Sequence, residues 1–217
     1  MVTGILFLIE EIMSLTVTEA LQRRAATNFF DAEKTLSAEQ IKELVRLATL
    51  APTAFNLQNW HFIAVQSPEA KQKLYGAAYN QQKIIDASVT FIICGELESH
   101  TRFDRVVKVL KDKGGVSEEN AQIWKSKVVA THENNPTIQH SEAFRSASLA
   151  GMALMLAAEE QGFVSGPMSG FVPELVSSAF NLTPNQIPVM LVAVGYAAEG
   201  NYPQSPRLDV DEVLTVV

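Results

Sequence analysis

Several features are scarce or missing in this sequence, and each absence narrows what the protein can be. Cys94 is the only cysteine among 217 residues, so no disulfide can form within the chain. No block of Lys and Arg occurs and the formal net charge is −7 at pH 7, which speaks against a nucleic-acid partner because phosphates would stay unneutralised. The apolar run Ile5–Ile9 is too short to span a bilayer and lacks the flanks of a signal peptide. We therefore expect no nucleic-acid or membrane partner, and a reducing cytoplasmic location with Cys94 as a buried, inert thiol.

The short sequence motifs of several common classes of nucleotide-binding protein and enzyme are also missing. Neither G-x-G-x-x-G nor G-x-x-x-x-G-K-[ST] occurs, so a bound phosphate would have to be met by arginine side chains instead of a glycine loop. The four histidines show no H-E-x-x-H spacing and no clustering with carboxylates, which speaks against a metal site. No G-x-S-x-G segment indicates a serine hydrolase.

Length and composition favour one globular domain with a substantial core. Apolar residues make up 47% of the chain and charged residues 19%, and helix and strand patterns alternate along it. Residues 1–13 do not match the pattern of the rest of the chain. We interpret residues 1–12 as translated upstream sequence before a natural start at Met13, or as an arm that packs on a partner subunit. The domain proper is then 14–217.

Local start signals and apolar periodicity define the predicted elements. Thr16-x-x-Glu19 and Ser37-x-x-Gln40 fit capping boxes that begin helices, and Ser67-Pro68 fits a third helix start. The polar region 97–135 is expected to form a helical cover over a binding site. The remaining patterns predict strands at 62–65, 89–94 and 187–194, helices at 99–112, 118–132 and 173–180, and a possible further strand in the tail at 213–217.

The longest helix pattern runs from Gln139 to Gln161 and ends at Gly162, as a C-terminal glycine should. Small and large apolar residues cover nearly its whole circumference, and a helix that is apolar all round is buried all round. The helix is therefore either the core helix of a monomer or the core of a dimer.

An uncharged polar stretch, Ala51–Phe62, separates a helix pattern from a strand pattern. It contains Thr53, Asn56, Gln58 and Asn59 but no Asp, Glu, Lys or Arg. Amide and hydroxyl groups at such a junction suit a flat, polar, largely neutral ligand, although a Pro-terminated helix followed by an ordinary loop would show the same composition.

The sequence of this stretch resembles the A-P-S-x-x-N-x-Q-P-W-x-F signature of the FMN-dependent nitroreductase family. Thr53 stands for the Ser and Asn59 for the second Pro. A second segment resembles the family's R-R-S-x-R-x-F motif through Arg23, Arg24 and Phe29. There Ala25 replaces the Ser and Thr27 replaces a basic residue.

Three more segments occur in the family's order. Asn80 and Lys83 match an N-x-x-K pair, whose spacing would place both side chains on one face of a helical turn. Pro167, Gly170 and Phe171 match a P-x-E-G-F-like turn in which Ser169 stands for Glu, and Arg207 matches a late K-x-R signature in which Ser205 replaces the lysine.

The resemblance implies an α+β fold of three α-β-α layers, with a central, mainly antiparallel sheet flanked by helices and a long central helix. It implies a homodimer with FMN at the subunit interface and NAD(P)H as the reductant. The arginines would hold the phosphate, and Lys83 would tune the flavin electrostatically. No catalytic acid, base or metal ligand is predicted. The residues implied in FMN binding are Arg23, Arg24, Ala25, Thr27, Pro52, Thr53, Asn56, Gln58, Asn80, Lys83, Pro167, Met168, Ser169, Gly170, Ser205 and Arg207.

The activity implied by the resemblance is reduction of nitroaromatics, quinones or similar small acceptors, by ping-pong hydride transfer through flavin N5. Two alternatives stay open. One is a different flavin chemistry on the same fold, such as reductive dehalogenation or oxidative flavin breakdown. The other is a flavin-binding protein without enzymatic activity.

Overall fold

The computed structural model describes residues 15–217, and the interpretation of residues 1–13 therefore lies outside them. At its centre is a sheet of four strands, β1 (Trp60–Val65), β2 (Val89–Glu96), β3 (Val164–Met168) and β4 (Gln186–Gly195). The strands are ordered β1-β2-β4-β3 and every neighbouring pair is antiparallel. The predicted antiparallel sheet is confirmed, and its third strand in chain order lies in the segment that carries Pro167.

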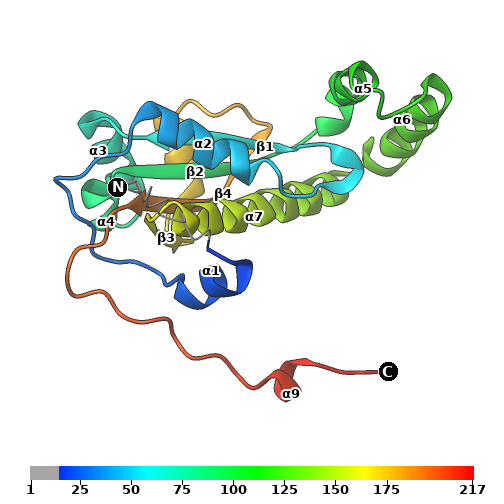
Figure 1. Cartoon of the computed structure of the whole chain (residues 1–217). Helices are drawn as coiled ribbons and strands as arrows, with labels where there is room; N and C mark the ends of the chain where they lie inside the picture. The colour runs from blue at the N-terminus through cyan, green and yellow to red at the C-terminus, as the bar shows by residue number, and fades with distance from the viewer. Residues whose placement is uncertain (1–14) are drawn as a thin grey trace, which may run out of the picture.

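Alternation along the strands divides the core into two layers. On β2, Ile92 and Cys94 face one side, together with residues of α3 (Pro68–Ala77), α4 (Lys83–Asp86) and α8 (Pro173–Ala179). The alternate residues Phe91 and Ile93 face the other side, where α2 (Ala38–Ala48) and α7 (Pro136–Glu160) pack. Because side chains of successive strand residues point to opposite faces, the sheet is covered on both sides. The three-layer α-β-α arrangement is confirmed (Figure 1).

The predicted helix starts are present. Thr16 and Glu19 form a capping box at α1 (Val17–Arg23), and Ser37 and Gln40 form another at α2. Ser67 caps α3, whose first residue is Pro68. These side chains accept hydrogen bonds from backbone N–H groups that have no partner inside the helix. This requirement explains why the helix starts could be predicted from the sequence.

The central helix α7 begins three residues earlier than predicted. Asn135 caps it through its side chain and Pro136 occupies the first helical turn, so this proline starts a helix instead of closing a loop. Its other end has Gly162 at φ 77°, as predicted. Ala147, Ala150 and Leu154 are fully buried, whereas Phe144 and Leu149 remain 40% and 41% exposed in the single chain.

The predicted helical cover projects beyond the sheet at one end of the molecule, beside the N-terminal part of α7 (Figure 1). It consists of η2 (Ser99–Arg102), α5 (Phe103–Asp112) and α6 (Glu118–His132). Its small core contains Phe103, Val107, Ala121 and Val128, and Leu57 joins it from the preceding polar stretch. The cover is therefore attached to the stretch Ala51–Phe62 by packing.

The chain after β4 runs away from the body (Figure 1). It contains one short helix, α9 (Val210–Val213), and residues 214–217 form no strand, so the strand predicted at 213–217 is not formed in the single chain. Leu208, Val213 and Val216 are exposed along it. Across residues 15–217, no helix is both long and apolar enough to cross a bilayer.

Candidate active site

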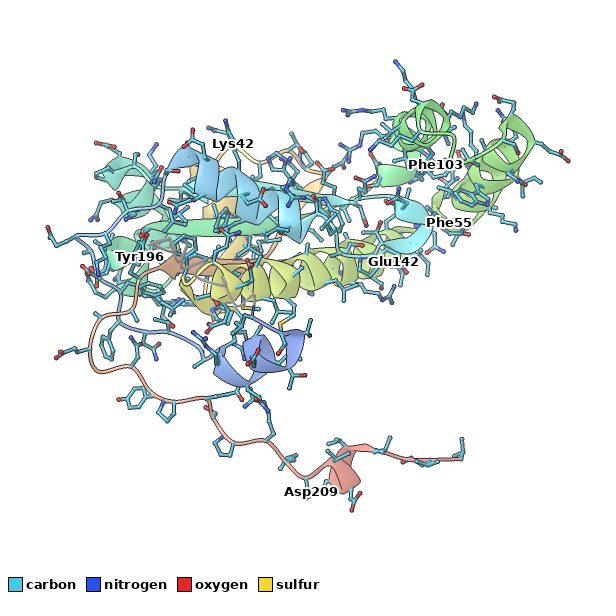
Figure 2. All side chains as sticks on the ribbon, in the orientation of Figure 1. Lys42, Phe55, Phe103, Glu142, Tyr196 and Asp209 are labelled. Carbon is cyan, nitrogen blue, oxygen red and sulfur yellow. The ribbon has the colours of Figure 1, made fainter. Side chains whose placement is uncertain are left out.

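The predicted site residues fall into two groups that lie at opposite ends of α7 within one chain. In Figure 2, Phe55 lies near Glu142 in the N-terminal part of α7, and Tyr196, which comes directly after β4, lies at the other end. We call residues 23–28, 79–83, 166–170 and 201–205 the charged half-site, and residues 52–58 the neutral half-site. Within a single chain, the neutral half-site therefore lies away from the charged half-site.

The charged half-site is built on an extension of the sheet. The segment after α1 runs beside β3, where the N–H of Thr27 donates to the carbonyl of Ser165 at 3.0 Å and Ala26 bridges to the same residue. A Cβ atom added at Gly166 would lie 2.4 Å from the carbonyl oxygen of Thr27. Glycine at 166 is therefore what lets these two segments approach.

Lys83 enters this half-site from the first turn of α4. Its Nζ donates to Asn28 Oδ1 at 2.8 Å, and burial lowers the pKa of its ammonium from the ordinary value. Asn28 is itself held by Asn201, whose Oδ1 accepts the N–H of Asn28 at 2.8 Å. Asn28 and Asn201 thus support the position of Lys83, although no sequence motif pointed to them.

The two arginines at the end of α1 have different environments. Arg23 forms an ion pair with Glu159 of α7 at 3.3 Å, and its side chain is 61% exposed. Arg24 has its Nε buried without a hydrogen-bond partner in the described part of the chain. A buried guanidinium N–H without an acceptor is unfavourable, and an anionic ligand would supply the missing acceptor. The Arg24 carbonyl accepts from Gln204 Nε2 at 2.7 Å, which fixes the backbone beside Ser205.

The turn after β3 is held by the segment before α4. Gln81 Nε2 donates to the carbonyl of Gly170 at 2.7 Å. Tyr79 and Asn80 both have positive φ, 53° and 54°, so Asn80 lies in a turn ahead of α4 and not on one helical face with Lys83. The prediction of a shared helical face was wrong because a left-handed turn intervenes. Ala25 lies in the same segment as Thr27, and Pro167, Met168 and Ser169 lie in the same segment as Gly170.

The Arg207 guanidinium bonds, among residues 15–217, only to the carbonyls of Ser205 and Pro206 directly before it, and the residue is exposed. Gln204, three residues earlier, bonds the Arg24 carbonyl, so this part of the tail begins close to Arg24. A role at the phosphate would require the Arg207 side chain to turn away from its own backbone.

The neutral half-site is one continuous, tightly turned segment. Phe55, Asn56 and Gln58 have φ of 51°, 54° and 48°, and the N–H of Gln58 donates to Thr53 Oγ1 at 3.0 Å. Pro52 and Thr53 line a cavity of about 260 Å³ against Arg145 and Leu149 of α7, among others. Positive φ is uncommon outside glycine, so three such residues indicate a backbone shape that the surroundings impose.

The cover supports this segment by packing against it. Phe55 meets the ring of His132 edge-on with centroids 6.3 Å apart, and His132 Nδ1 lies 3.0 Å from the carbonyl of Val128. Phe103 and His132 are buried, whereas Trp124 is 38% exposed. Of these three aromatic side chains of the cover, two are thus packing residues.

Both the sequence and the fold are similar to those of known proteins. A protein of Bacillus subtilis (strain 168), provisionally named as the NAD(P)H nitroreductase YodC, is 34% identical over 197 residues, which are 91% of this chain and 96% of that protein. The structure of a provisionally named nitroreductase of Exiguobacterium sibiricum 255-15, in complex with FMN, has a TM-score of 0.87 at 25% identity and covers 93% of this chain and 97% of its own. A provisionally named NAD(P)H:FMN oxidoreductase of Staphylococcus epidermidis ATCC 12228 has a TM-score of 0.88 at 25% identity, with 92% and 95% covered. The family model described as Nitroreductase family matches residues 20–196. The resemblance deduced from the motifs is thereby confirmed: the chain belongs to the nitroreductase family of oxidoreductases.

Proposed function

We propose that the protein is an FMN-dependent NAD(P)H oxidoreductase that reduces nitroaromatics, quinones or similar small acceptors. The observation that carries the proposal is the set of donors in the charged half-site, where the segment that runs beside β3 carries the unpartnered Arg24 Nε, and Lys83 Nζ bonds to Asn28 of the same segment. When bound, FMN would supply the hydride-transfer chemistry between NAD(P)H and the acceptor, while the residues of the charged half-site would hold and orient it.

Each part of the charged half-site has a distinct role in this proposal. Arg23 and Arg24 hold the phosphate, because a guanidinium matches a phosphate with two parallel hydrogen bonds. Lys83, oriented by Asn28, places positive charge where the pyrimidine end of the flavin gains negative charge on reduction. The segment Pro167–Gly170 offers backbone groups to the edge of the ring. No side chain of the site is assigned as a general acid or base.

We further propose that two copies assemble about a two-fold axis, so that the neutral half-site of one copy covers the flavin held by the charged half-site of the other. Three observations support this. The two half-sites are apart in one chain, α7 leaves Phe144 and Leu149 partly exposed, and the tail carries exposed apolar residues that no part of the described chain covers. The buried Cys94 is compatible with the cytoplasm as its location.

A spectrum of the purified protein tests cofactor binding, and turnover tests the activity. The proposal expects flavin absorbance after addition of FMN, and NAD(P)H oxidation that depends on nitrofurazone or a quinone. Flavin binding without turnover would favour a non-enzymatic flavin protein, whereas turnover that only halogenated or flavin substrates elicit would favour the other chemistries. A protein that fails to bind FMN would contradict the proposal.

Complementation tests the shared site directly. One variant, Arg23→Ala/Arg24→Ala, disables the charged half-site, and a second, Thr53→Trp, fills the neutral half-site. Each should be inactive alone. After co-refolding, roughly a quarter of wild-type activity should return, because half of the random pairs are mixed and each mixed pair has one intact site of two. No recovery in a mixture shown to contain mixed dimers would contradict a site shared between copies.

A further inference from the structure

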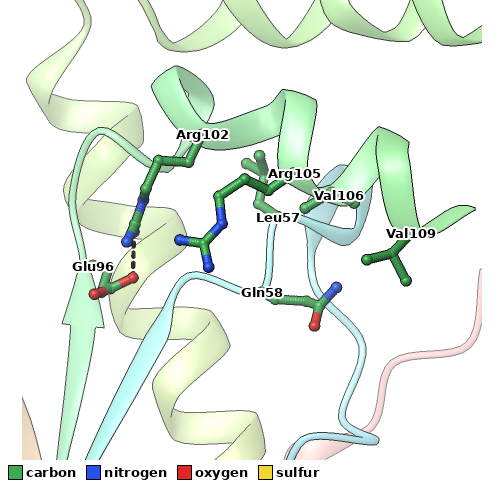
Figure 3. Close-up of a pocket in the computed structure, with 7 residues that line it drawn as sticks. All are labelled: Leu57, Gln58, Glu96, Arg102, Arg105, Val106 and Val109. Atoms are coloured by element: carbon green, nitrogen blue, oxygen red, sulfur yellow. Dashed lines mark hydrogen bonds and ion pairs between the residues drawn. The ribbon is translucent and has the colours of Figure 1, made fainter.

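A separate cavity of about 270 Å³ lies between the neutral half-site and the cover. It is lined by Leu57 and Gln58, by Glu96 at the end of β2, and by Arg102, Arg105, Val106 and Val109 of η2 and α5 (Figure 3). The walls therefore combine apolar side chains with two guanidinium groups. Apart from Leu57 and Gln58, none of these lining residues belongs to the two half-sites.

The two arginines line the cavity from the junction of two short helices. Arg102 ends η2, where its φ of −107° and ψ of 9° depart from helical values, and Arg105 lies three residues later in α5. Figure 3 shows both guanidinium groups directed toward the cavity, with Arg105 between Arg102 and Gln58.

Only one of these arginines has a counter-ion among residues 15–217. Arg102 forms an ion pair with Glu96. Arg105 forms no ion pair and no side-chain hydrogen bond with any residue from 15 to 217, although the chain as a whole carries an excess of seven acidic charges. The lining thus contains two positively charged side chains and one negatively charged side chain. Its net charge is +1, and its other side chains are apolar except for Gln58.

We infer that this cavity is an oxyanion-binding subsite, in which Arg105 is the principal ligand and Arg102 the second. The planar fork of a guanidinium pairs with carboxylate or phosphate oxygens through two parallel hydrogen bonds. Leu57, Val106 and Val109 provide apolar contact for the body of the molecule that carries the anion. The volume suits a small ring or the anionic end of a larger molecule.

The position of the cavity connects the subsite to the proposed reaction. Leu57 and Gln58 come directly after Thr53–Asn56, so an anion held at Arg105 would fix a molecule beside the neutral half-site. The assignment of this anion to a substrate rests on the proposed function, whereas binding of the anion itself does not. Two sources share the required chemistry, namely a carboxylate on the acceptor and the 2′-phosphate that distinguishes NADPH from NADH.

Substitution of Arg105 with a matched control tests the inference. Arg105→Gln removes the unpaired guanidinium, and Lys108→Gln removes one positive charge from the same exposed helix without touching the cavity. The first measurement is calorimetric titration of benzoate and of inorganic phosphate into the FMN-treated full-length protein. Arg105→Gln should weaken binding of at least one of these anions by about tenfold, and Lys108→Gln should leave it within about twofold of wild type.

Turnover then identifies the source of the anion. If it is the acceptor, Arg105→Gln lowers the ratio of kcat/KM for 4-nitrobenzoate to that for 4-nitrobenzamide by about tenfold, because these acceptors differ mainly in charge. If it is the reductant, the same variant lowers the ratio for NADPH to NADH instead. Lys108→Gln should keep both ratios.

Two results overturn the inference. One is wild-type protein that binds neither benzoate nor phosphate, and the other is an Arg105→Gln variant that changes neither binding nor either ratio relative to Lys108→Gln. Anion binding that depends on Arg105 in a protein without NAD(P)H oxidation would instead keep the subsite and remove the proposed function. Glu96→Gln offers a second readout, since removal of the carboxylate that competes for Arg102 should tighten binding of the same anion severalfold.

Discussion

The two half-sites are constructed in opposite ways. The charged half-site draws on four segments spread over about 180 residues of sequence, and hydrogen bonds such as Gln204 to Arg24 and Asn201 to Asn28 join them. The neutral half-site is a single turn of seven residues whose shape depends on the local bond from Gln58 to Thr53 and on packing against the cover. The positions of the charged side chains therefore depend on the whole fold. The positions of the neutral hydrogen-bonding groups depend on one loop.

This difference has a mechanical consequence. A change at one member of the charged half-site shifts segments that come from distant parts of the chain. A change of one side chain in the neutral half-site affects a single loop, which contacts the cover and the N-terminal part of α7. We expect substitutions in the charged half-site to have larger effects, and single substitutions in each half-site test that order.

The broadest effect is expected for Gly166→Ala, which should reduce both the stability of the fold and FMN affinity. The new methyl group would lie 2.4 Å from the Thr27 carbonyl, so β3 and the segment after α1 must separate. Overpacking of this kind reduces the free energy of unfolding by about 1–3 kcal/mol, and FMN affinity should fall in parallel. Urea unfolding and titration of flavin fluorescence measure the two quantities.

Gly76→Ala is the matched control for that substitution. Gly76 lies within α3, and an added Cβ has no neighbour within 4 Å, so the alanine should stabilise the protein by about 0.5–1 kcal/mol. If both alanines had the same effect, Gly166 would not be a spacer between the two segments.

Next in size is Arg24→Ala, which should weaken FMN binding by about 1.5–3 kcal/mol through loss of a charge-assisted contact. Arg23→Ala should have a smaller effect because Arg23 is more exposed and already paired with Glu159, and Arg207→Ala should be smaller still unless dimerisation brings the tail to the phosphate. Arg46→Ala, at an exposed arginine paired with Glu43, is the control. Equal losses for Arg24 and Arg46 would show that net charge, and not the site, determines affinity.

Lys83→Gln should lower the reduction potential of the bound flavin, because it removes the positive charge that stabilises the negatively charged reduced form. A change of about 1–2 kcal/mol corresponds to roughly 20–45 mV for a two-electron couple. Lys71→Gln is the control, because burial also lowers the pKa of Lys71, whose Nζ instead donates to the carbonyl of Ile85 at 3.0 Å in α4. Lys71→Gln should reduce stability without a shift in the flavin reduction potential. An equal shift in both variants would show that Lys83 does not specifically tune the flavin.

The smallest effect is expected in the neutral half-site. Thr53→Val removes the acceptor of the Gln58 N–H, which should cost about 0.5–1.5 kcal/mol of stability and weaken FMN only severalfold. Thr101→Val, which loses a comparable exposed hydroxyl bond to the Glu98 carbonyl, is the control for stability. FMN affinity that falls more with Thr53→Val than with Arg24→Ala would reverse the order of the two half-sites.

The same contrast explains which parts of the fold and of the candidate site could be predicted from the sequence. Helix starts depend on residues three apart, so Thr16 with Glu19 and Ser37 with Gln40 were recognisable. Short apolar runs predicted three of the four strands, and the antiparallel sheet followed from the family resemblance; β3 was missed. The neutral half-site was found first because it is contiguous. The supporting residues of the charged half-site, Asn28, Asn201 and Gln204, were missed because their hydrogen bonds link positions brought together only by the fold.

Two errors have physical reasons of their own. Asn80 and Lys83 were placed on one helical face from their spacing alone, but Asn80 has a positive φ of 54° and lies before α4. The start of the central helix was predicted at Gln139, whereas α7 begins at Pro136, since a proline in the first helical turn leaves no helix hydrogen bond unmade. Spacing gives a face only once the backbone conformation is known.

The buried, unpartnered Nε of Arg24 has a consequence for how the protein behaves without its cofactor. A group left without an acceptor makes the native state less stable by about 1–3 kcal/mol, and a bound phosphate would restore that amount. By thermodynamic linkage, each rise in free FMN above its dissociation constant would then raise the melting temperature. Because Arg24 is the C-cap of the short α1, the first element to loosen on cofactor depletion should be α1, and amide hydrogen exchange there would report the supply of FMN.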